Sequence, residues 1–402
     1  MRLLVVSNTP FLPANAGNRR RIRTMLGHLA GRGVDVALLL LPDWDVAEWD
    51  VAGMRRVLAR VDVAEPPRGG SLARVGAAVR RRLDRLRPPA ALGLDDWCPR
   101  WFRARVAELA REWRPDAVMV EYVFLSACLV DLPRTAGGPR TIIDTHDLMH
   151  RRADSYASAG VPLRWFHTSY ADERRGLARA DVVLAISPPE AAVLRAMVPE
   201  RTVLTVPHAE PLAFAPETAR PARLLVVASD NDLNVAGLRW LLADVWPALR
   251  AARADAELVV CGRVGEKIEA LPAGVVRRGF VESLATEYAD ARVVLAPVAG
   301  ATGLSIKVAE ALCHGRPVVA TTAGAAGFPS PAEAGITVAD DAGAFAAGVR
   351  RLLDDEDHWR RAVAAARRAA VAFSPEAAFG PLERLLVGRP MPGVGEALGD
   401  RA

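Results

Sequence analysis

The densest group of chemically useful residues lies between Pro297 and Thr322, in the run PVAGATGLSIKVAEALCHGRPVVATT. Its order predicts a strand end, a glycine-rich turn, a short helix, a tight turn and a buried strand. Gly300, Gly303 and Ser305 would let backbone N–H groups approach an anion closely, and the following helix would point its positive dipole end at that anion. The run therefore predicts an anion site at the turn.

Two charged residues of the predicted helix, Lys307 and Glu310, would share one face, because side chains three residues apart are neighbours. A cation at the start of the helix suits a phosphate, and a carboxylate one turn later suits ribose hydroxyls. The chain has only two lysines, Lys267 and Lys307, among its 52 basic residues. A lysine is a compact point charge that fits against phosphate where a guanidinium fork does not. These residues indicate a nucleoside diphosphate, although a surface ion pair between Lys307 and Glu310 explains them equally well.

Length and composition place these residues in a multidomain globular protein. The 402 residues suggest two or three domains, and 25% charged with 51% hydrophobic residues is ordinary for such a protein. The net charge of +5 suits an anionic small molecule or an anionic membrane surface. It is not the dense basic stripe of a nucleic-acid binder, so no nucleic-acid partner is expected.

The four cysteines, Cys98, Cys128, Cys261 and Cys313, lie far apart in the sequence without a CxxC motif. Their spacing indicates neither a disulfide framework nor a zinc site, and a reducing cytoplasm is expected. The N-terminal sequence lacks the pattern of a signal peptide, and no apolar run has the length of a membrane span.

Apolar runs alternate with helical patterns along most of the chain, which predicts doubly wound parallel sheets. A proline-rich stretch divides two such series, so we expect an N-terminal Rossmann-like domain (1–206), a linker (207–222), a C-terminal Rossmann-like domain (223–375) and a helix with a tail (376–402). The strands are expected at 3–6, 34–41, 117–121, 140–144, 181–186, 202–207, 224–229, 257–262, 293–297 and 317–321. The helices are expected at 19–32, 99–113, 163–180, 189–197, 235–251, 283–289, 305–314, 342–353 and, with a break near Ser374, 362–387.

The run from 279 to 324 resembles the retaining glycosyltransferases of family 4, which have the GT-B fold. It carries that family's G-F-V, an acidic turn, A-D-A, an apolar strand ending in Pro, the glycine turn and E-A-L-x-x-G-x-P-V-V. NVAGLRWLLADVWPALR, at 234–250, is similar to a helix pattern of one subgroup, and the N-terminal NTPFLPANAGNRRRIRTMLGHLAGRGVDV resembles the acceptor-side opening of that subgroup. The resemblance covers most of the chain and implies two Rossmann-like domains facing across a cleft.

The resemblance implies transfer of a sugar from a nucleotide-diphosphate donor to a hydroxyl of a sugar, lipid or small-molecule acceptor, with retention and without a metal or other cofactor. Glu310 matches the family's ribose-binding glutamate. The family's first glutamate is replaced by Thr302, which puts the identity of the donor sugar in doubt. The expected donor-binding residues are Gly17, Asn18, Val281, Thr302, Gly303, Leu304, Ser305 and Glu310.

Catalytic roles are expected for His146, Lys307 and Arg263. His146 matches the family's cleft histidine, with a satisfied structural histidine as the alternative. The turn at 229–232 is acidic where many relatives carry Arg and Lys, so Lys307 and Arg263 are expected to supply the positive charge.

The acceptor is expected to contact the N-terminal domain at Arg19, Glu121 and Asp147. The other arginines of the run 19–23 are expected to lie on a solvated helix face.

Two further sequence patterns, the D-x-D strings and a basic segment, have simpler explanations. The D-x-D strings at 43–45 and 230–232 are typical of metal sites in another fold and are attributed to chance. The segment 68–89 has the pattern of a basic amphipathic helix that would rest on an anionic membrane, which would place the protein at the inner membrane face. An ordinary surface helix packed on the sheet is the preferred explanation.

Three other functions stay open from the sequence. A nucleotide-sugar 2-epimerase of the same fold would convert the donor without an acceptor. A non-catalytic nucleotide-sugar-binding auxiliary protein would be consistent with Thr302. A dinucleotide oxidoreductase is the most distant alternative, because neither half carries the GxGxxG fingerprint.

Overall fold

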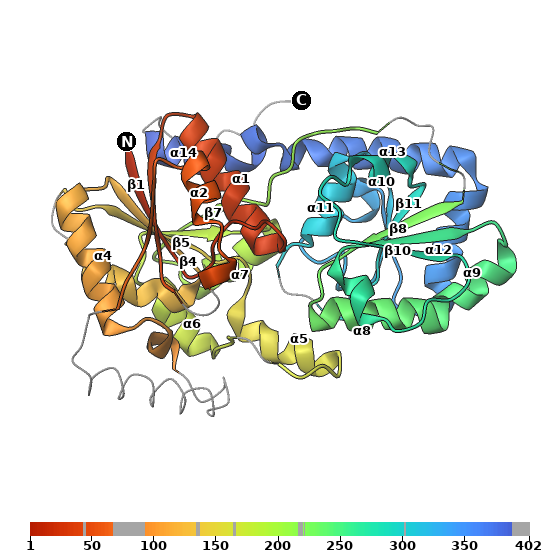
Figure 1. Cartoon of the computed structure of the whole chain (residues 1–402), viewed down its shortest axis with the longest axis horizontal. Helices are drawn as coiled ribbons and strands as arrows, with labels where there is room; N and C mark the ends of the chain where they lie inside the picture. The colour runs from red at the N-terminus through yellow and green to blue at the C-terminus, as the bar shows by residue number, and fades with distance from the viewer. Residues whose placement is uncertain are drawn as a thin grey trace, which may run out of the picture.

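The computed structural model describes residues 1–42, 46–66, 93–133, 137–163, 166–215, 220, 222–300 and 303–387. These residues form two α/β lobes that lie side by side along the longest axis of the molecule (Figure 1). The predicted basic helix at 68–89, the string at 43–45 and Thr302 lie outside the described residues. Among the residues described, no helix combines the length and the apolar character needed to cross a bilayer.

The N-terminal lobe is built on a seven-stranded parallel sheet with the order β3-β2-β1-β4-β5-β6-β7. Its inner strands are short apolar runs buried on both faces, as expected for a parallel sheet covered by helices. The strands are β1 (Arg2–Ser7), β2 (Asp35–Leu40), β3 (Arg60–Val63), β4 (Ala117–Glu121), β5 (Arg140–Asp144), β6 (Val182–Ala185) and β7 (Thr202–Thr205).

Helices and short 3-10 turns connect these strands. The α-helices described in this part of the chain are α1 (Gly17–Gly31), α2 (Val51–Val57), α4 (Arg100–Trp113), α5 (Arg152–Ser158), α6 (Tyr170–Leu177) and α7 (Pro188–Met197). The sequence prediction of one helix over 163–180 is wrong: Ser169 caps the start of α6 by accepting a hydrogen bond from the Asp172 amide, and α5 was not predicted.

The C-terminal lobe repeats the architecture with a six-stranded parallel sheet of order β10-β9-β8-β11-β12-β13. Its strands are β8 (Arg223–Val227), β9 (Glu257–Cys261), β10 (Val275–Gly279), β11 (Val293–Ala296), β12 (Val318–Ala320) and β13 (Ile336–Val338). Its helices are α8 (Asp232–Trp240), which continues through a π turn (Leu241–Val245) into α9 (Trp246–Ala252), α10 (Ala285–Asp290), α11 (Ile306–Cys313), α12 (Ala342–Asp354) and α13 (Glu356–Ala370).

Both sheets reverse their strand order at the centre, between β1 and β4 in one lobe and between β8 and β11 in the other. In open parallel sheets the loops at the carboxyl ends of the strands beside such a reversal form a crevice that receives ligands. The loops after β1, β4, β8 and β11 are therefore the structural counterparts in the two lobes.

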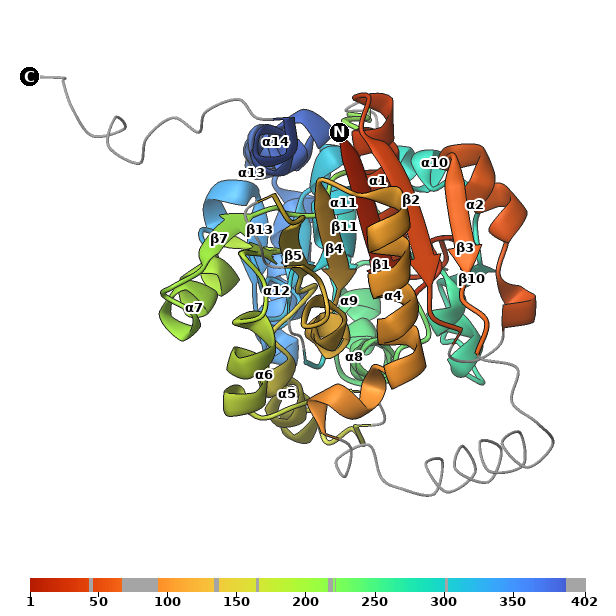
Figure 2. The ribbon, with the colours of Figure 1, turned by 90° about the vertical axis from the view of Figure 1, so that its left-hand side faces the viewer.

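The last described helix, α14 (Pro375–Val387), leaves the C-terminal lobe and packs on the N-terminal one (Figure 2). Ala378, Phe379, Leu382 and Leu386 belong to the buried cluster around β1 and β2. Arg140 at the start of β5 also donates a hydrogen bond to the Leu385 carbonyl oxygen at 3.0 Å. The chain thus crosses twice between the lobes, once before β8 and once before α14.

Candidate active site

The glycine turn after β11 lies between the two lobes. Gly303 has φ +82°, and a Cβ at this position would lie 2.9 Å from the carbonyl oxygen of His146, in the loop after β5. Gly17, the first residue of α1, faces Ile306, the first residue of α11, where a Cβ would lie 3.0 Å from Cδ1. Because Gly303 needs both a positive φ and a close backbone approach, only glycine fits there without strain.

Lys307 in the first turn of α11 is partly buried and meets a neutral partner. Its ammonium group donates a short hydrogen bond to Oδ1 of Asn234 in α8. Asn234 in turn donates to the carbonyl and hydroxyl oxygens of Ser229, each at 3.2 Å. Burial lowers the pKa of Lys307 to about 8, and no charged neighbour offsets that effect. The site therefore holds a cation whose counter-charge is not supplied by the described part of the chain.

A glycine in α8 explains how Asn234 reaches this position. A Cβ at Gly237 would collide with the backbone carbonyl of Pro297, the residue that opens the glycine turn. The absence of a side chain lets α8 lie directly against the turn. The N-x-x-G pattern of the sequence thus places Asn234 beside Lys307.

Ser305 is the N-cap residue of α11, yet its hydroxyl does not cap the helix. The buried Oγ has no hydrogen-bond partner among the described residues. Buried hydroxyl groups are nearly always paired, so an unpaired one at a helix N-terminus indicates a place for an external hydrogen-bonding group. Two other predicted donor residues, Leu304 and Val281, pack with the C-terminal core and can offer a ligand only backbone groups.

Glu310 is held by a residue from the other lobe. Arg20 in α1 donates to both carboxylate oxygens, from NH1 to Oε2 at 2.9 Å and from NH2 to Oε1 at 2.7 Å. The same NH2 group lies 2.8 Å from Oε1 of Glu210, in the linker between the lobes. The alternative of a surface ion pair between Lys307 and Glu310 is therefore wrong. So is the expectation that Arg20 lies on a solvated helix face.

The N-terminal side of the crevice contains a network of buried charged side chains. Arg21, fully buried in α1, forms a two-pronged hydrogen bond with Asp144 at 2.9 and 2.8 Å. Nε2 of His146 lies 2.5 Å from Oε2 of Glu121 and 3.6 Å from Oδ2 of Asp144. Arg21 is thus a second residue that contradicts the expected solvated face.

The pKa values of the two carboxyl groups in this network shift in opposite directions. Burial raises the pKa of Glu121, and the hydrogen bond from His146 offsets that effect only in part. Burial acts in the same direction on Asp144, but Arg21 and His146 together outweigh it and lower its pKa. Asp144 is therefore the firmly ionised member.

Backbone strain accompanies this arrangement. His146 and Tyr122 have positive φ values, 60° and 67°, at the ends of the neighbouring strands β5 and β4. Their rings stack with centroids 4.1 Å apart, and the Tyr122 hydroxyl accepts a hydrogen bond from Asn18 at 3.0 Å. Non-glycine residues in such conformations cluster at functional sites.

The remaining predicted residues are paired within the protein. Arg263 follows β9 and lies 3.1 Å from Asp230, so the acidic turn after β8 neutralises it in part. Asp147 binds Arg152 at 2.8 Å. Arg19 donates to the Pro13 carbonyl oxygen at 3.3 Å.

Glu121, Asp144 and His146 come within 4.8 Å of one another, the distance range of a metal site. The donor set does not suit a cation, because both oxygens of Asp144 already bind the guanidinium of Arg21. That positive charge would repel a metal ion at the same carboxylate.

Sequence reasoning missed four residues that bear on the site: Arg20, Arg21, Asn234 and Glu190. Glu190 in α7 is hydrogen-bonded by the backbone N–H groups of Gly303 and Leu148, and burial raises the pKa of its carboxyl to about 8. Its S-P-P-E context signals only a helix start, which Ser187 indeed provides. Asn234 was visible in the N-x-x-G pattern, whereas nothing near the two arginines in the sequence indicates their distant partners.

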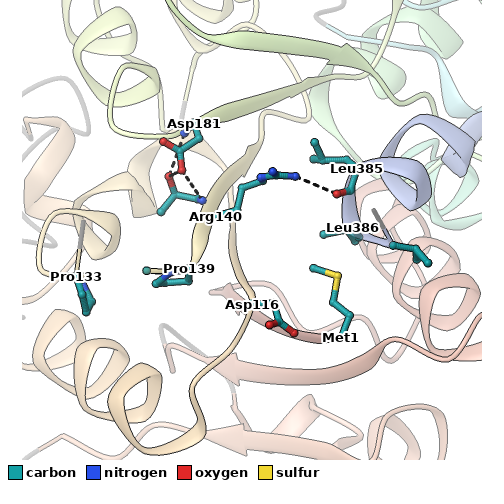
Figure 3. A pocket seen from close by; sticks show the side chains of 11 residues that line it. Met1, Asp116, Pro133, Pro139, Arg140, Asp181, Leu385 and Leu386 are labelled. Carbon is teal, nitrogen blue, oxygen red and sulfur yellow. Dashed lines mark hydrogen bonds between the residues drawn. The ribbon is translucent and has the colours of Figure 1, made fainter. Parts of the chain in front are cut away.

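A cavity of about 850 Å³ lies elsewhere, at the amino ends of the N-terminal strands (Figure 3). Its polar groups are satisfied internally: Arg140 binds the Leu385 carbonyl oxygen, and Asp181 accepts from the Thr141 hydroxyl at 2.8 Å. Parallel α/β sheets bind ligands at the opposite ends of their strands. This cavity is therefore not the site that the crevice residues form.

Two family models match the chain: the Glycosyl transferase 4-like domain over 16–209 and Glycosyl transferases group 1 over 221–355. Together with the two parallel-sheet lobes, they show that this chain belongs to the glycosyltransferases of the GT-B fold, family 4. Among curated protein sequences none is significantly similar.

Solved structures share the fold at low sequence identity. Sucrose-phosphate synthase from Thermosynechococcus elongatus has a TM-score of 0.67 and 19% identity, over 96% of this chain and all (100%) of that one. HepE from Anabaena, solved in complex with UDP, has a TM-score of 0.66 and 12% identity, over 97% of this chain and 100% of that one. An apo structure of OtsA has a TM-score of 0.63 and 13% identity, over 98% of this chain and 100% of that one.

Proposed function

We propose that this protein transfers a sugar from a nucleoside-diphosphate sugar to a hydroxyl acceptor, with retention of anomeric configuration and without a metal ion. One observation carries the proposal: Lys307 is a partly buried ammonium without a counter-charge, in the first turn of the helix whose N-cap hydroxyl is unpaired among the described residues. A diphosphate supplies what both groups lack. The complex of HepE with UDP, a structure of the same fold, supports this class of ligand.

In this proposal the C-terminal lobe binds the donor. Lys307, the Ser305 hydroxyl and the first amides of α11 receive the diphosphate, and Glu310 accepts hydrogen bonds from the ribose. Charge grows on the departing diphosphate as the glycosidic bond breaks, so fixed donors at that place lower the barrier. Arg263 contributes less, because Asp230 already pairs with it.

In this proposal His146 of the N-terminal lobe lies next to the donor sugar. Its contact with Gly303 brings it to the glycine turn, and Glu121 holds its Nε2. The backbone carbonyl and Nδ1 of His146 are the groups that can face a sugar hydroxyl. The acceptor, a sugar, a lipid or a small molecule, would enter on the side of Arg19 and Asp147. The expected contact between Glu121 and the acceptor is wrong, because Glu121 is 0% exposed and bound to His146.

The proposal is tested by a thermal-shift panel of UDP-, GDP- and ADP-sugars, followed by assay of released nucleotide with candidate acceptors. A ligand that binds only the native state raises Tm. We expect one nucleotide series to raise Tm and its turnover to persist in EDTA. No shift with any series would contradict the proposal, and an epimer formed from donor alone would favour the 2-epimerase.

A further inference from the structure

We infer that Arg20 occupies the ribose-binding oxygens of Glu310 in the ligand-free protein and is released to Glu210 when a nucleotide binds. The inference rests on the proposed function, because it takes Glu310 as the ribose-binding carboxylate. It adds a residue of the opposite lobe that sets the affinity for the nucleotide.

The geometry of the Arg20–Glu310 pair makes the two partners mutually exclusive. The guanidinium fork meets both carboxylate oxygens, at 2.9 and 2.7 Å, so it takes the positions that face outward from the carboxyl group. A ribose presents its two neighbouring hydroxyls to a carboxylate in the same two-pronged way. Glu310 is only 4% exposed, so little room is left for a third partner.

Glu210 is the alternative ion-pair partner of Arg20. Its Oε1 already lies 2.8 Å from the Arg20 NH2 group. Burial raises the pKa of Glu210, but the hydrogen bond from His208 and the charge of Arg20 outweigh it and keep the pKa low. The carboxylate is thus ionised and fixed by His208 at 2.8 Å, while its backbone N–H binds the Phe373 carbonyl oxygen at 2.9 Å.

The position of Glu210 ties this exchange to the connection between the lobes. Glu210 belongs to the first chain crossing, and Phe373 lies directly before the second. Arg20 comes from α1 of the N-terminal lobe and Glu310 from α11 of the C-terminal lobe. Binding of a ribose at Glu310 would therefore remove the Arg20–Glu310 contact between the lobes and strengthen the Arg20–Glu210 contact at the first chain crossing.

The proposed exchange predicts that removal of the Arg20 cation strengthens nucleotide binding, the opposite of the usual effect. A cation near a phosphate site ordinarily favours a polyanion, so its removal should weaken binding. If Arg20 instead competes with the ribose, its removal leaves Glu310 buried and unpaired in the free protein, and nucleotide binding improves. Removal of Glu210 acts the other way, because the displaced Arg20 then loses its ionised partner.

The test measures Kd by calorimetry for wild type, Arg20→Met, Arg20→Lys and Glu210→Gln. The probes are UDP, GDP and ADP, and inorganic pyrophosphate, which has no ribose. We expect Arg20→Met to bind the preferred nucleotide about tenfold more tightly, a change of about 1.4 kcal/mol, and Glu210→Gln to bind it several-fold more weakly. Arg20→Lys, which frees one oxygen of Glu310, should lie between wild type and Arg20→Met.

Pyrophosphate separates competition at the ribose from a general charge effect. Its Kd should not decrease in Arg20→Met, because it makes no contact with Glu310. Weaker or unchanged nucleotide binding in Arg20→Met would overturn the inference, as would equal gains for pyrophosphate and nucleotide. Failure of all three nucleotides to bind wild type would instead contradict the proposed function.

Discussion

The two sides of the crevice differ in how their charges are paired. On the N-terminal side Arg21, Asp144, His146 and Glu121 form one buried network in which each charged group meets a group of opposite charge, although Arg21 NH1 and Glu121 Oε1 lack a hydrogen-bond partner among the described residues. On the C-terminal side Lys307 has only a neutral amide, and the Ser305 hydroxyl has no partner among the described residues. In the proposed function the first group therefore positions His146, whereas the second receives the ligand.

The largest expected effect is on the stability of the N-terminal side. Arg21→Met leaves Asp144 buried without its partner and should lower the free energy of unfolding by about 3–5 kcal/mol. Urea denaturation measures this change. Arg23→Met, an exposed position on the same helix, is the matched control and should stay within about 0.5 kcal/mol of wild type. Equal stabilities of the two variants would show that the Arg21–Asp144 pair does not stabilise the N-terminal lobe.

The C-terminal side should show the reverse pattern in Lys307→Met. Loss of the ammonium should lower kcat by about 100-fold or more, because it removes a fixed stabiliser of the departing diphosphate. Tm should stay unchanged or rise, since a partly buried charge without a counter-charge is removed. Lys267→Met, which changes the chain's other lysine at an exposed position, should leave kcat unaltered. Full turnover in Lys307→Met would exclude this residue from the mechanism.

The pH dependence of activity and stability should run in opposite directions. Lys307 has a pKa of about 8 in the folded protein and 10.5 as its ordinary value, so between these pH values the unfolded chain binds more protons. The contribution of Lys307 to the free energy of unfolding therefore rises with pH across that window. By contrast, kcat/KM should fall above pH 8 as the ammonium deprotonates. Lys307→Met should remove the rise in stability; persistence of that rise would assign it to another group.

The smallest effect is expected for Ser305→Ala. The hydroxyl has no partner in the free protein, so its removal should leave Tm unchanged or slightly higher. Nucleotide affinity should fall by about two- to tenfold, the value of one hydrogen bond. Ser283→Ala, at an exposed position before α10, is the control. Equal affinities for Ser305→Ala and wild type would remove the hydroxyl from the site.

The sequence predicts the inner strands of this fold well and misses three of the four edge strands of the two described sheets. The bounds of β4 and β5 agree residue for residue with the expected 117–121 and 140–144, because these central strands are continuous apolar runs. The three strands that were missed, β3, β10 and β13, all lie at sheet edges. An edge strand is half exposed, so β10 reads VVRRG and carries no continuous apolar signal.

The candidate site was predictable where its chemistry is local and not where it depends on distant pairs. Gly303, Ser305, Lys307 and Glu310 lie within one short run, and their spacing alone indicated an anion site. The partners of Arg20 and Arg21 are 290 and 123 residues away in the chain. A single sequence cannot reveal such pairs, so the two arginines read as an ordinary solvated run.

The return of α14 to the N-terminal lobe limits how the molecule can be divided. A fragment that stops at the linker would expose to water the apolar surface of the N-terminal lobe that Phe379 and Leu382 normally cover. A fragment that starts at the linker would expose the apolar face of α14 itself. Neither half is therefore self-sufficient, and a single cut in the linker should leave the two pieces associated. Opening of the crevice is confined to bending about the line through both crossings, because two covalent connections do not permit free swivelling.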